Sequence, residues 1–475
     1  MEATTPTTLQ DERLPLTGSA FSSSQSWPTK TLIAISLALV VFASIGVFEA
    51  SSNAPAFCDS TAQSSGHIKL TTKANAHYFY WFFESRGNPA TDPLVLWLQG
   101  GPGGSSMFAL LAENGPCSIG PDGASTTPNP ISWTNHANVI WVDQPTGTGF
   151  SYGPEADYDS TADQAAAALV DFLHGWFKLH PQFIHHDFFV TGESYAGHYV
   201  PALATALRKT PTRHAGDIQI NLKGIAIGNG FTSPLIQIQH QADLMQANAY
   251  NKTLLTDDEM AAYKKNVSEV AALAARCYAN DTIACVQATA QWTTGLRTPL
   301  LTIAHVDEYD LRHDMLSPSN GQTINSPALP TFLNNPLVQA QLHIDPPRTW
   351  QVSALDVFER FAADFFRNYE AHVAALLQEE EGIRVLIYAG DADLMCNWKG
   401  QEAWTTALVW HGQDEFQAAA PTPFIIDGDA KGELRRAGNL NFLRIFDSGH
   451  MVPTDQPAVA LEMLRRFTHS PFQGL

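Results

Sequence analysis

Residues 188–197 read Phe-Phe-Val-Thr-Gly-Glu-Ser-Tyr-Ala-Gly, and they are the most informative segment for predicting the fold. Its apolar start predicts a short buried strand, and residues 199–207 predict a helix. Gly192 and Ala196 stand two positions on either side of Ser194, and such small residues let the chain turn sharply between strand and helix. The serine hydroxyl is then lifted clear of the sheet, where it can act as a nucleophile. The position between a strand and a helix favours the nucleophile, and an ordinary turn at a strand end is the alternative interpretation of this GxSxG-type pattern.

Short apolar runs like the one before Ser194 recur along the chain and alternate with helical patterns. A helix is expected over residues 165–179, capped by Asp159 or Ser160, and the last helix over residues 455–469. This alternation predicts an α/β fold with a mostly parallel sheet and helices on both faces. The expected buried strands are residues 94–98, 139–142, 187–191, 222–227 and 384–388, and an aromatic strand is expected at 77–84.

Residues 235–350 break this rhythm. They begin helix-like and then become rich in loops, with prolines at positions 327, 330, 336, 346 and 347. We expect an insertion over the sheet, within a single domain that spans residues 57–475.

The first 56 residues differ in kind from the rest. Residues 1–30 form a polar tail, and residues 31–48 are an apolar run of 18 residues, at the short end of what spans a bilayer. Lys30 flanks this run on its N-terminal side, which favours a cytosolic N-terminus. The run is either a signal anchor, retained as a single membrane span, or part of a cleaved signal peptide. Both alternatives deliver residues 57–475 to an oxidising lumen.

Composition excludes several classes of protein. Of the 475 residues 44% are hydrophobic, which is enough for a large core and excludes disorder over most of the chain. Acidic residues outnumber basic ones by 47 to 27, and without a basic cluster a nucleic-acid-binding protein is excluded. Five cysteines with no CxxC pair argue against a zinc ribbon or a thioredoxin-type site.

Three Asn-x-Ser/Thr sequons begin at Asn251, Asn266 and Asn280. Their clustering predicts a glycosylated surface and passage through the secretory pathway. The destination stays open between extracellular, vacuolar or lysosomal, and membrane-anchored with a lumenal catalytic domain. The oligomeric state also stays open.

A serine nucleophile needs a base and an acid that orients it, and two later loops supply candidates. One strand ends at Asp391 and Asp393, and another, over residues 441–446, ends shortly before His450. The order Ser, Asp, His and the position after strand ends are those of a catalytic triad on an open α/β sheet. His450 would accept the Ser194 proton and Asp393 would hold its ring, while Asp391 is equally suited to capping a helix.

The loop Gly100-Gly101-Pro102-Gly103-Gly104 follows the strand at 94–98. Gly101 N–H is the expected oxyanion donor there, and Tyr195 N–H is the second. A phosphate-binding loop is the alternative, but the Gly-Lys-Ser/Thr that such a loop requires does not follow.

At this point the chain resembles the serine carboxypeptidases, with its start and the stretch 113–117 most similar to fungal members. The resemblance implies an α/β-hydrolase fold that releases C-terminal amino acids from peptides through an acyl-enzyme, favoured at acidic pH and without a metal or cofactor. The matching segments are WLQGGPGGSS (97–106), ENGP (113–116), DQPTGTGFSY (143–152), GESYAG (192–197), GNG (228–230), IYAGDADLMCNW (387–398) and SGHMVPTDQP (448–457).

The resemblance also implies roles for single residues. Ser194, Asp393 and His450 stand at the triad positions, so that Asp393 is preferred to Asp391, and Gly101 and Tyr195 stand at the oxyanion-hole positions. Substrate-binding positions are Gln99, Gly100, Glu113, Glu193 and Met451, the two glutamates facing the substrate's C-terminal carboxylate and Met451 lying beside the pocket for the leaving amino acid.

Two carboxyl groups can bind a carboxylate only if a proton stays on the pair. Because adjacent acids cannot easily both ionise, one pKa rises, and the protonated group then donates a hydrogen bond. Peptide KM is therefore expected to rise above about pH 6.

The chain departs from the family pattern at two positions. Gln99 replaces the usual asparagine, which leaves an acyltransferase or esterase as an alternative function, and a catalytically silent lumenal binding protein as another. Gly104 replaces a frequent cysteine, so the pairs that remain are Cys58 with Cys117 and Cys277 with Cys285. Cys396 would be a free thiol near the site and sensitive to mercurials, or else a buried inert cysteine.

Overall fold

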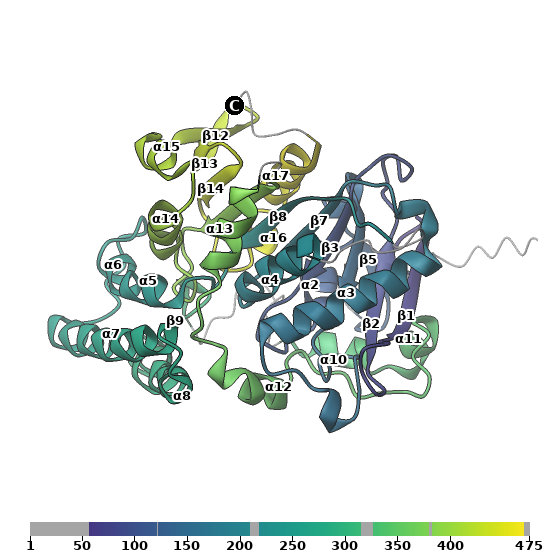
Figure 1. Ribbon diagram of the computed structural model, residues 1–475, viewed down its shortest axis with the longest axis horizontal. Helices are drawn as coiled ribbons and strands as arrows, with labels where there is room; N and C mark the ends of the chain where they lie inside the picture. Colours follow the sequence, from purple (N-terminus) through teal and green to yellow (C-terminus); the bar gives the residue numbers. More distant parts are fainter. Residues whose placement is uncertain (1–56, 121, 210–217, 315–325, 380–381, 470–475) are drawn as a thin grey trace, which may run out of the picture. The chain divides into compact units, whose positions relative to one another are not determined.

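The computed structural model describes residues 57–120, 122–209, 218–314, 326–379 and 382–469 (Figure 1). Ala56–Leu475 form one unit, separate from Met1–Pro55. The tail 1–30 and the apolar run 31–48 lie outside the described residues. Among the helices that are described, none combines the length and the apolar character needed to cross a bilayer.

A ten-stranded sheet forms the centre of the described chain. Its six middle strands are parallel, and antiparallel strands flank them on both sides. This confirms the predicted α/β class with a mostly parallel sheet. In sheet order the strands are β1 (Gln63–Lys69), β2 (His77–Phe83), β6 (Asn138–Val142), β3 (Leu94–Leu98), β7 (Phe188–Glu193), β8 (Leu222–Gly228), β11 (Arg384–Gly390), β14 (Leu440–Ile445), β13 (Asp429–Ala437) and β12 (Thr422–Ile426).

Helices cover both faces of this sheet, because its middle strands are apolar on both sides. All five residues of β3 are buried, and they alternate between two hydrophobic cores. Leu94, Leu96 and Leu98 pack in the core with α3 (Ala162–Leu179) and α4 (Ala196–Lys209). Val95 and Trp97 pack on the other face, with α2 (Ser106–Ala112) and α17 (Pro457–His469).

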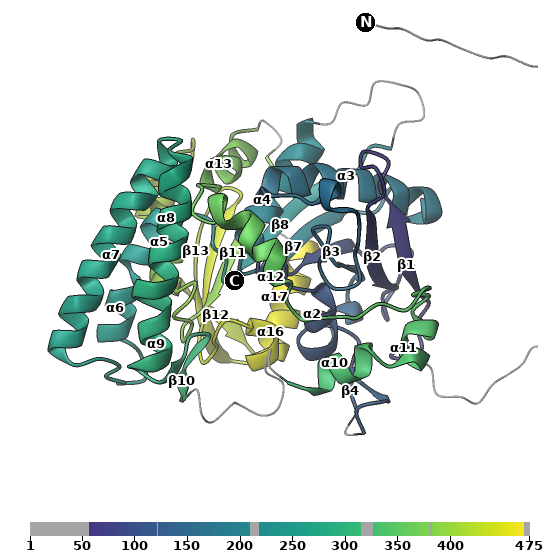
Figure 2. The same cartoon turned by 90° about the horizontal axis from the view of Figure 1, so that it is seen from below.

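Most of the remaining helices lie in the segment between β8 and β11. Both views place α5 to α8 on the side of the sheet away from β1 and β2 (Figures 1 and 2). These helices are α5 (Pro234–Gln239), α6 (Gln241–Gln246), α7 (Asp257–Tyr278), α8 (Thr282–Trp292), a π-helical turn η4 (Thr293–Arg297), α9 (Thr298–Thr302), α10 (Ala328–Leu333), α11 (Pro336–Gln341), α12 (Leu355–Arg360), a 3₁₀ turn η5 (Phe361–Ala363) and α13 (Glu370–Gln378).

The other elements are small and lie outside that segment, apart from one short hairpin within it. They are the hairpins β4 (Cys117–Ile119) with β5 (Thr126–Pro128) and β9 (Val306–Asp307) with β10 (Asp310–Asp314), the helices α14 (Trp398–Ala407), α15 (Gln413–Ala418) and α16 (Val452–Asp455), and the 3₁₀ turns η1 (Trp133–Asn135), η2 (Glu155–Asp157) and η3 (Pro181–Phe183).

The predicted cap of the helix before β7 was wrong. Helix α3 begins at Ala162, and Thr161 caps it by accepting a hydrogen bond from Gln164 N at 3.2 Å. Asp159 is instead used in a buried ion pair with Lys73 at 2.5 Å, which no local pattern reveals. The last helix is also divided, because Pro457 lacks an N–H and starts a new helix, α17, after α16.

The parallel strands bring all candidate catalytic residues to one edge of the sheet. Gln99 follows β3, Ser194 begins the turn after β7, and Asp393 and His450 lie in the loops after β11 and β14. Because these strands point the same way, their carboxyl ends meet at a single edge, where open α/β sheets place their sites.

Candidate active site

Ser194 occupies a left-handed turn between β7 and α4, with φ of +65°. A non-glycine residue pays about 1–2 kcal/mol for this conformation. Three hydrogen bonds hold it: Ser194 N donates to Gly228 O at 3.1 Å, and Ser194 O accepts from Gly197 N at 2.9 Å and from Phe231 N at 2.8 Å. A Cβ on Gly197 would lie 2.6 Å from Phe231 N, so the turn requires glycine there.

The glycine loop after β3 lies directly against this turn. A Cβ on Gly100 would come within 2.4 Å of Tyr195 N, so only glycine permits the approach. Gly101, with φ of +111°, lines the same cavity as Ser194 and Tyr195. Backbone N–H groups next to a nucleophile are what a developing oxyanion requires.

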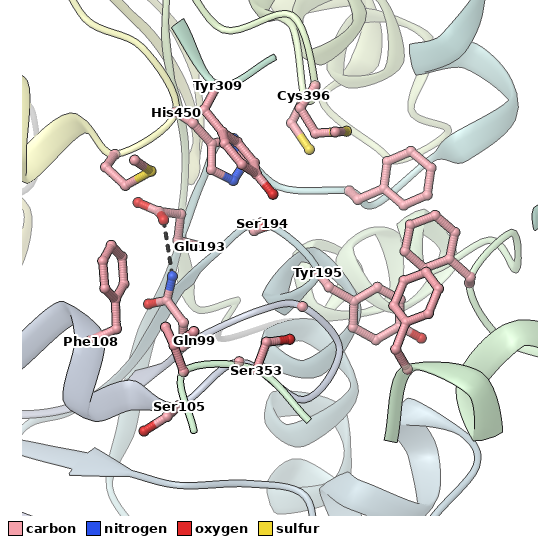
Figure 3. A pocket seen from close by; sticks show the side chains of 18 of the residues that line it. Gln99, Ser105, Phe108, Glu193, Ser194, Tyr195, Tyr309, Ser353, Cys396 and His450 are labelled. Carbon is pink, nitrogen blue, oxygen red and sulfur yellow. Dashed lines mark hydrogen bonds between the residues drawn. The ribbon is translucent and has the colours of Figure 1, made fainter. Parts of the chain in front are cut away.

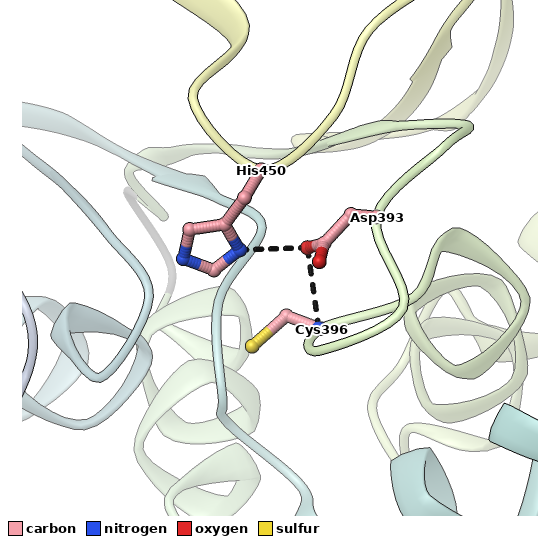
Figure 4. A group of neighbouring side chains, drawn as sticks. All are labelled: Asp393, Cys396 and His450. Carbon is pink, nitrogen blue, oxygen red and sulfur yellow. Dashed lines mark hydrogen bonds and ion pairs between the residues drawn. The ribbon is translucent and has the colours of Figure 1, made fainter. Parts of the chain in front are cut away.

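His450 and Asp393 form a buried pair at the same edge (Figure 4). His450 Nδ1 lies 2.7 Å from Asp393 Oδ2, and both side chains are almost completely buried. Met395 N and Cys396 N also donate to the Asp393 carboxylate, at 2.8 and 3.2 Å. Asn229 donates its amide to Asp393 Oδ2 at 2.8 Å. Sequence analysis noted the Gly-Asn-Gly at this point without giving Asn229 a role.

Two opposing effects act on the pKa of His450. Burial lowers it, but the negative charge of Asp393 and the hydrogen bond to that carboxylate outweigh burial, so the pKa is raised. Asp391, the alternative acid, faces elsewhere: its carboxylate accepts from Tyr250 OH and lies 3.4 Å from Arg444 Nη2. It caps no helix.

A cavity of about 160 Å³ lies over Ser194 (Figure 3). No hydrogen bond joins Ser194 Oγ to His450 among the described residues, and in unliganded enzymes such bonds often tighten only when substrate binds. The cavity is lined by Gln99, Gly101, Gly104, Ser105, Phe108, Glu193, Ser194, Tyr195, Phe231, Trp292, Arg297, Tyr309, Val352, Ser353, Phe358, Phe365, Met395, Cys396, His450 and Met451.

A pair of buried carboxyl groups lies at one side of this cavity. Glu193 lines it, whereas Glu113 contacts Glu193 and is not among the lining residues. Gln99 Nε2 donates to Glu193 Oε1 at 3.1 Å, and Trp97 Nε1 fixes the amide by donating to Gln99 Oε1 at 2.9 Å. In Figure 3 the Gln99 and Glu193 side chains point toward each other. The glutamine therefore keeps an amide donor at the carboxyl pair.

The pair retains a proton well above the usual range of a carboxylic acid. Burial raises the pKa of Glu113 to about 7. Burial, followed by the charge of Glu113 and a hydrogen bond between the two groups, raises the pKa of Glu193 well above 4.5. If both groups were ionised, no donor among the described residues would reach either oxygen of Glu113. A hydrogen bond between two carboxyl groups requires a shared proton, which is consistent with the raised pKa of both groups.

Asp143, which follows β6, is a residue whose role sequence analysis did not assign. It is fully buried and accepts from Ser105 Oγ at 2.6 Å, from Ser106 N at 3.0 Å and from Phe150 N at 2.9 Å. Burial raises the pKa of Asp143 to about 6. Its bonds tie the end of the glycine loop to the loop after β6. The signal was an acidic residue directly after an apolar strand.

The cysteines fall into two disulfides and one thiol. Cys58 is bonded to Cys117, and Cys277 to Cys285, and none of these four residues lines the cavity. Cys396 is free, buried and in the cavity wall, and burial raises its pKa well above the usual value. Ligand atoms of Cys396, Asp393 and His450 lie within 4.8 Å of one another and could hold a soft metal ion, but two of the three residues are already joined as a pair.

The sequon residues lie away from the cavity, between α6 and α8. Asn251 and Asn280 are exposed. Asn266 is half-buried, and its Nδ2, the atom to which a glycan would be attached, donates to Gly295 O at 2.9 Å.

Known proteins are similar to this chain in sequence and in structure. The sequence profile described as serine carboxypeptidase matches residues 55–470. Serine carboxypeptidase 3 of Hordeum vulgare is 39% identical over 406 residues, 85% of this chain and 77% of the relative. A vacuolar serine-type carboxypeptidase of Saccharomyces cerevisiae is 37% identical over 414 residues, 86% of this chain and 79% of the relative. Among solved structures, Kex1(delta)p, a prohormone-processing carboxypeptidase from Saccharomyces cerevisiae, has a TM-score of 0.74 at 24% identity and covers 86% of this chain and 91% of its own. That likeness shows the α/β-hydrolase fold alone.

Proposed function

The chain belongs to the serine carboxypeptidase family and is a peptide hydrolase of that kind, and we propose that Ser194, His450 and Asp393 carry its chemistry. Ser194 Oγ attacks the last peptide carbonyl while His450 Nε2 takes its proton, and Asp393 orients the imidazole through Nδ1. The new oxyanion accepts hydrogen bonds from Gly101 N–H and Tyr195 N–H, a contribution of about 3 kcal/mol per donor at comparable sites.

His450 then gives its proton to the leaving amine, and the C–N bond breaks. The acyl group stays on Ser194 Oγ until water, deprotonated by His450, attacks the ester and releases the shortened peptide.

The carboxyl pair and Gln99 recognise the free C-terminus of the substrate. Protonated Glu193 donates to the substrate carboxylate, Gln99 Nε2 supplies a second donor, and Glu113 returns a hydrogen bond to Glu193. This arrangement next to Ser194, inside one cavity, is the observation that carries the proposal, because an endopeptidase has no need of a donor for a terminal carboxylate. Met451, in the same wall, contacts the leaving amino acid.

Two titrations limit the pH range. Peptide binding weakens as pH rises through the pKa of Glu113, about 7. The rate falls as pH drops through the raised pKa of His450, because an imidazolium cannot accept the serine proton. The peptide kcat/KM is therefore bell-shaped in pH: protonation of His450 limits it on the acidic side and ionisation of Glu113 limits it on the alkaline side.

The test uses the full chain, wild type and Ser194→Ala, with a peptide that has a free C-terminus and the matching C-terminal amide, at about pH 5 to 6. Release of the last amino acid from the free acid, weak on the amide and lost in Ser194→Ala, is expected. No release from either peptide, with Ser194 still labelled by an organophosphate, would contradict the proposal and would favour an esterase or acyltransferase. Gln99 gives no separate support to that alternative, since its amide reaches Glu193.

For the cell, we propose a lumenal place in the secretory pathway. Support comes from the two disulfides and from the vacuolar yeast relative. Sequencing the mature N-terminus distinguishes anchoring through residues 31–48 from cleavage of that run, and cell fractionation distinguishes a vacuolar or lysosomal destination from secretion. We also propose that the catalytic domain spans residues 57–475, with residues 235–350 as its insertion and 1–30 as a tail; the match of the family profile to residues 55–470 supports the extent of the domain.

A further inference from the structure

Asp364 is a buried carboxyl group that the mechanism above does not use. It follows η5 and is fully buried. Its carboxylate accepts from Tyr195 OH at 2.6 Å, from Tyr369 OH at 3.1 and 3.2 Å, and from Ala162 N, at the first residue of α3, at 2.9 Å. No Lys, Arg or His among the described residues forms an ion pair with it. Two phenols and the N-terminus of an 18-residue helix therefore solvate this carboxyl group.

One of the two phenols that donate to Asp364 belongs to Tyr195, the residue directly after the proposed nucleophile. In Figure 3 the Tyr195 side chain points away from Gln99 and Glu193. Two rings stack on it: Phe365 at 5.5 Å with an angle of 8°, and His198 at 4.3 Å with an angle of 18°. With the ring clamped and the hydroxyl bonded, the Tyr195 side chain has one available position.

This side chain can influence the oxyanion hole because the proposed donor, Tyr195 N–H, belongs to the planar peptide unit between Ser194 and Tyr195. In a trans peptide the C=O and the N–H are fixed in opposite directions. Ser194 O is held by Gly197 N and Phe231 N, so the direction of Tyr195 N–H is set at the oxygen end of the unit. At the other end, Tyr195 Cα is set by the clamped side chain. His198 links the two ends, because it stacks on Tyr195 and its Nδ1 bonds to Phe231 O.

We propose that Asp364 is a positioning residue of the oxyanion hole: its hydrogen bond to the Tyr195 phenol aims the Tyr195 N–H at the oxyanion. The inference rests on the proposed role of Tyr195 N–H as a donor. Because a misplacement of about 1 Å in such a group can lower a rate by roughly 100-fold, loss of the Asp364 contact is expected to lower kcat by about 10- to 100-fold with little change in KM.

The test compares Asp364→Asn, Tyr195→Phe and the double variant in the full chain. Asparagine at position 364 keeps the size of the group, but one accepting oxygen becomes an NH2 group that faces the donors of the phenols and of Ala162 N. Phenylalanine at position 195 keeps the stacked ring and removes the hydroxyl. Each single variant is expected to lower kcat on a peptide and on an ester by the same factor. The double variant is expected to be no slower than the worse single variant, since both changes remove one contact.

The matched control is Asp159→Asn. Asp159 is also buried and lies 3.4 Å from a phenol, Tyr78 OH, but neither residue lines the cavity. This variant is expected to lower the melting temperature and to leave kcat of the folded enzyme unchanged. An unchanged kcat in Tyr195→Phe, or additive losses in the double variant, would overturn the proposal, and Tyr195→Phe keeps it testable if Asp364→Asn does not fold.

Phosphonylation of Ser194 by an organophosphate gives a readout that does not depend on the peptide substrate, because the phosphoryl oxygen uses the same hole. If the wild type is labelled but releases no amino acid, the proposed function fails, and the labelling rates still decide on Asp364. If the wild type is an exopeptidase and Asp364→Asn is labelled as fast as the wild type, only the inference about Asp364 fails.

Discussion

Replacing Glu113 by glutamine is expected to remove the upper pH limit on peptide binding, because Glu113 is the group that we propose sets it. Glutamine at position 113 still donates a hydrogen bond to Glu193 but cannot ionise. In the wild type, ionised Glu113 would accept the hydrogen bond of Glu193, which keeps its proton longer, so this donor would be withdrawn from the substrate carboxylate, which would also face a negative charge. Raising the pH through the pKa of Glu113, about 7, therefore raises the peptide KM.

The size of the effect follows from the fraction of enzyme that can bind. If only enzyme with protonated Glu113 binds, the apparent KM is the intrinsic value divided by that fraction. With a pKa of about 7, about half of Glu113 is protonated at pH 7 and about one-tenth at pH 8. The wild-type KM should then rise about twofold by pH 7 and about tenfold by pH 8, relative to about pH 5. In Glu113→Gln it should change by less than about threefold over the same range.

The assay measures kcat and KM separately, because protonation of His450 changes the rate and not the binding of the terminal carboxylate. Initial rates of amino-acid release are followed at several peptide concentrations between about pH 5 and pH 8. Two controls accompany the variant. Glu415→Gln removes an exposed acid of the same type, and a substrate with a C-terminal amide lacks the group that the pair binds.

Two results would refute this reasoning. One is a wild-type peptide KM that stays flat from about pH 5 to pH 8. The other is a Glu113→Gln variant whose KM rises as steeply as that of the wild type, since some other group would then set the limit.

Gln99→Ala should raise peptide KM by about 10- to 100-fold without affecting the amide substrate, since a hydrogen bond to a charged group is worth about 1.5–3 kcal/mol. Gln63→Ala, which removes another glutamine that accepts from a tryptophan (Trp81) at 3.0 Å, is the matched control and should leave KM unchanged. Asn229→Ala should lower kcat by about tenfold or more, because Asp393 loses a buried donor; an unchanged pre-steady-state acylation rate would contradict this. Cys396 should react with iodoacetamide far more slowly than free cysteine at neutral pH, because burial disfavours its thiolate; rapid alkylation seen by mass spectrometry would contradict it.

The strands from β2 to β14 in sheet order were predictable because each is a mostly apolar run, whereas β1, β12 and β13 at the two sides of the sheet were not expected, since β1 and β13 are mostly polar and β12 is short. Residues 94–98 coincide with β3, and the other runs that were identified lie within one or two residues of the observed strands. Helix ends were less accessible. The cap of α3 was missed because Asp159 and Thr161 are both good capping residues, and only the ion pair of Asp159 with Lys73, 86 positions earlier in the chain, decides between them.

The candidate catalytic residues and their order could be predicted from the sequence alone: a serine in a sharp turn after a strand, then an aspartate and a histidine, each after a later strand. These features are local, since they depend on strand, turn and residue type within a few positions. Tertiary structure decided which groups share a proton or a hydrogen bond across the chain. Three such contacts join residues far apart in sequence: Glu113 with Glu193, Asn229 with Asp393, and Asp364 with the Tyr195 phenol. The physical reason is that pKa values and hydrogen-bond directions are set by burial and by the nearest charges, and both exist only once the parallel strands have brought their carboxyl ends together.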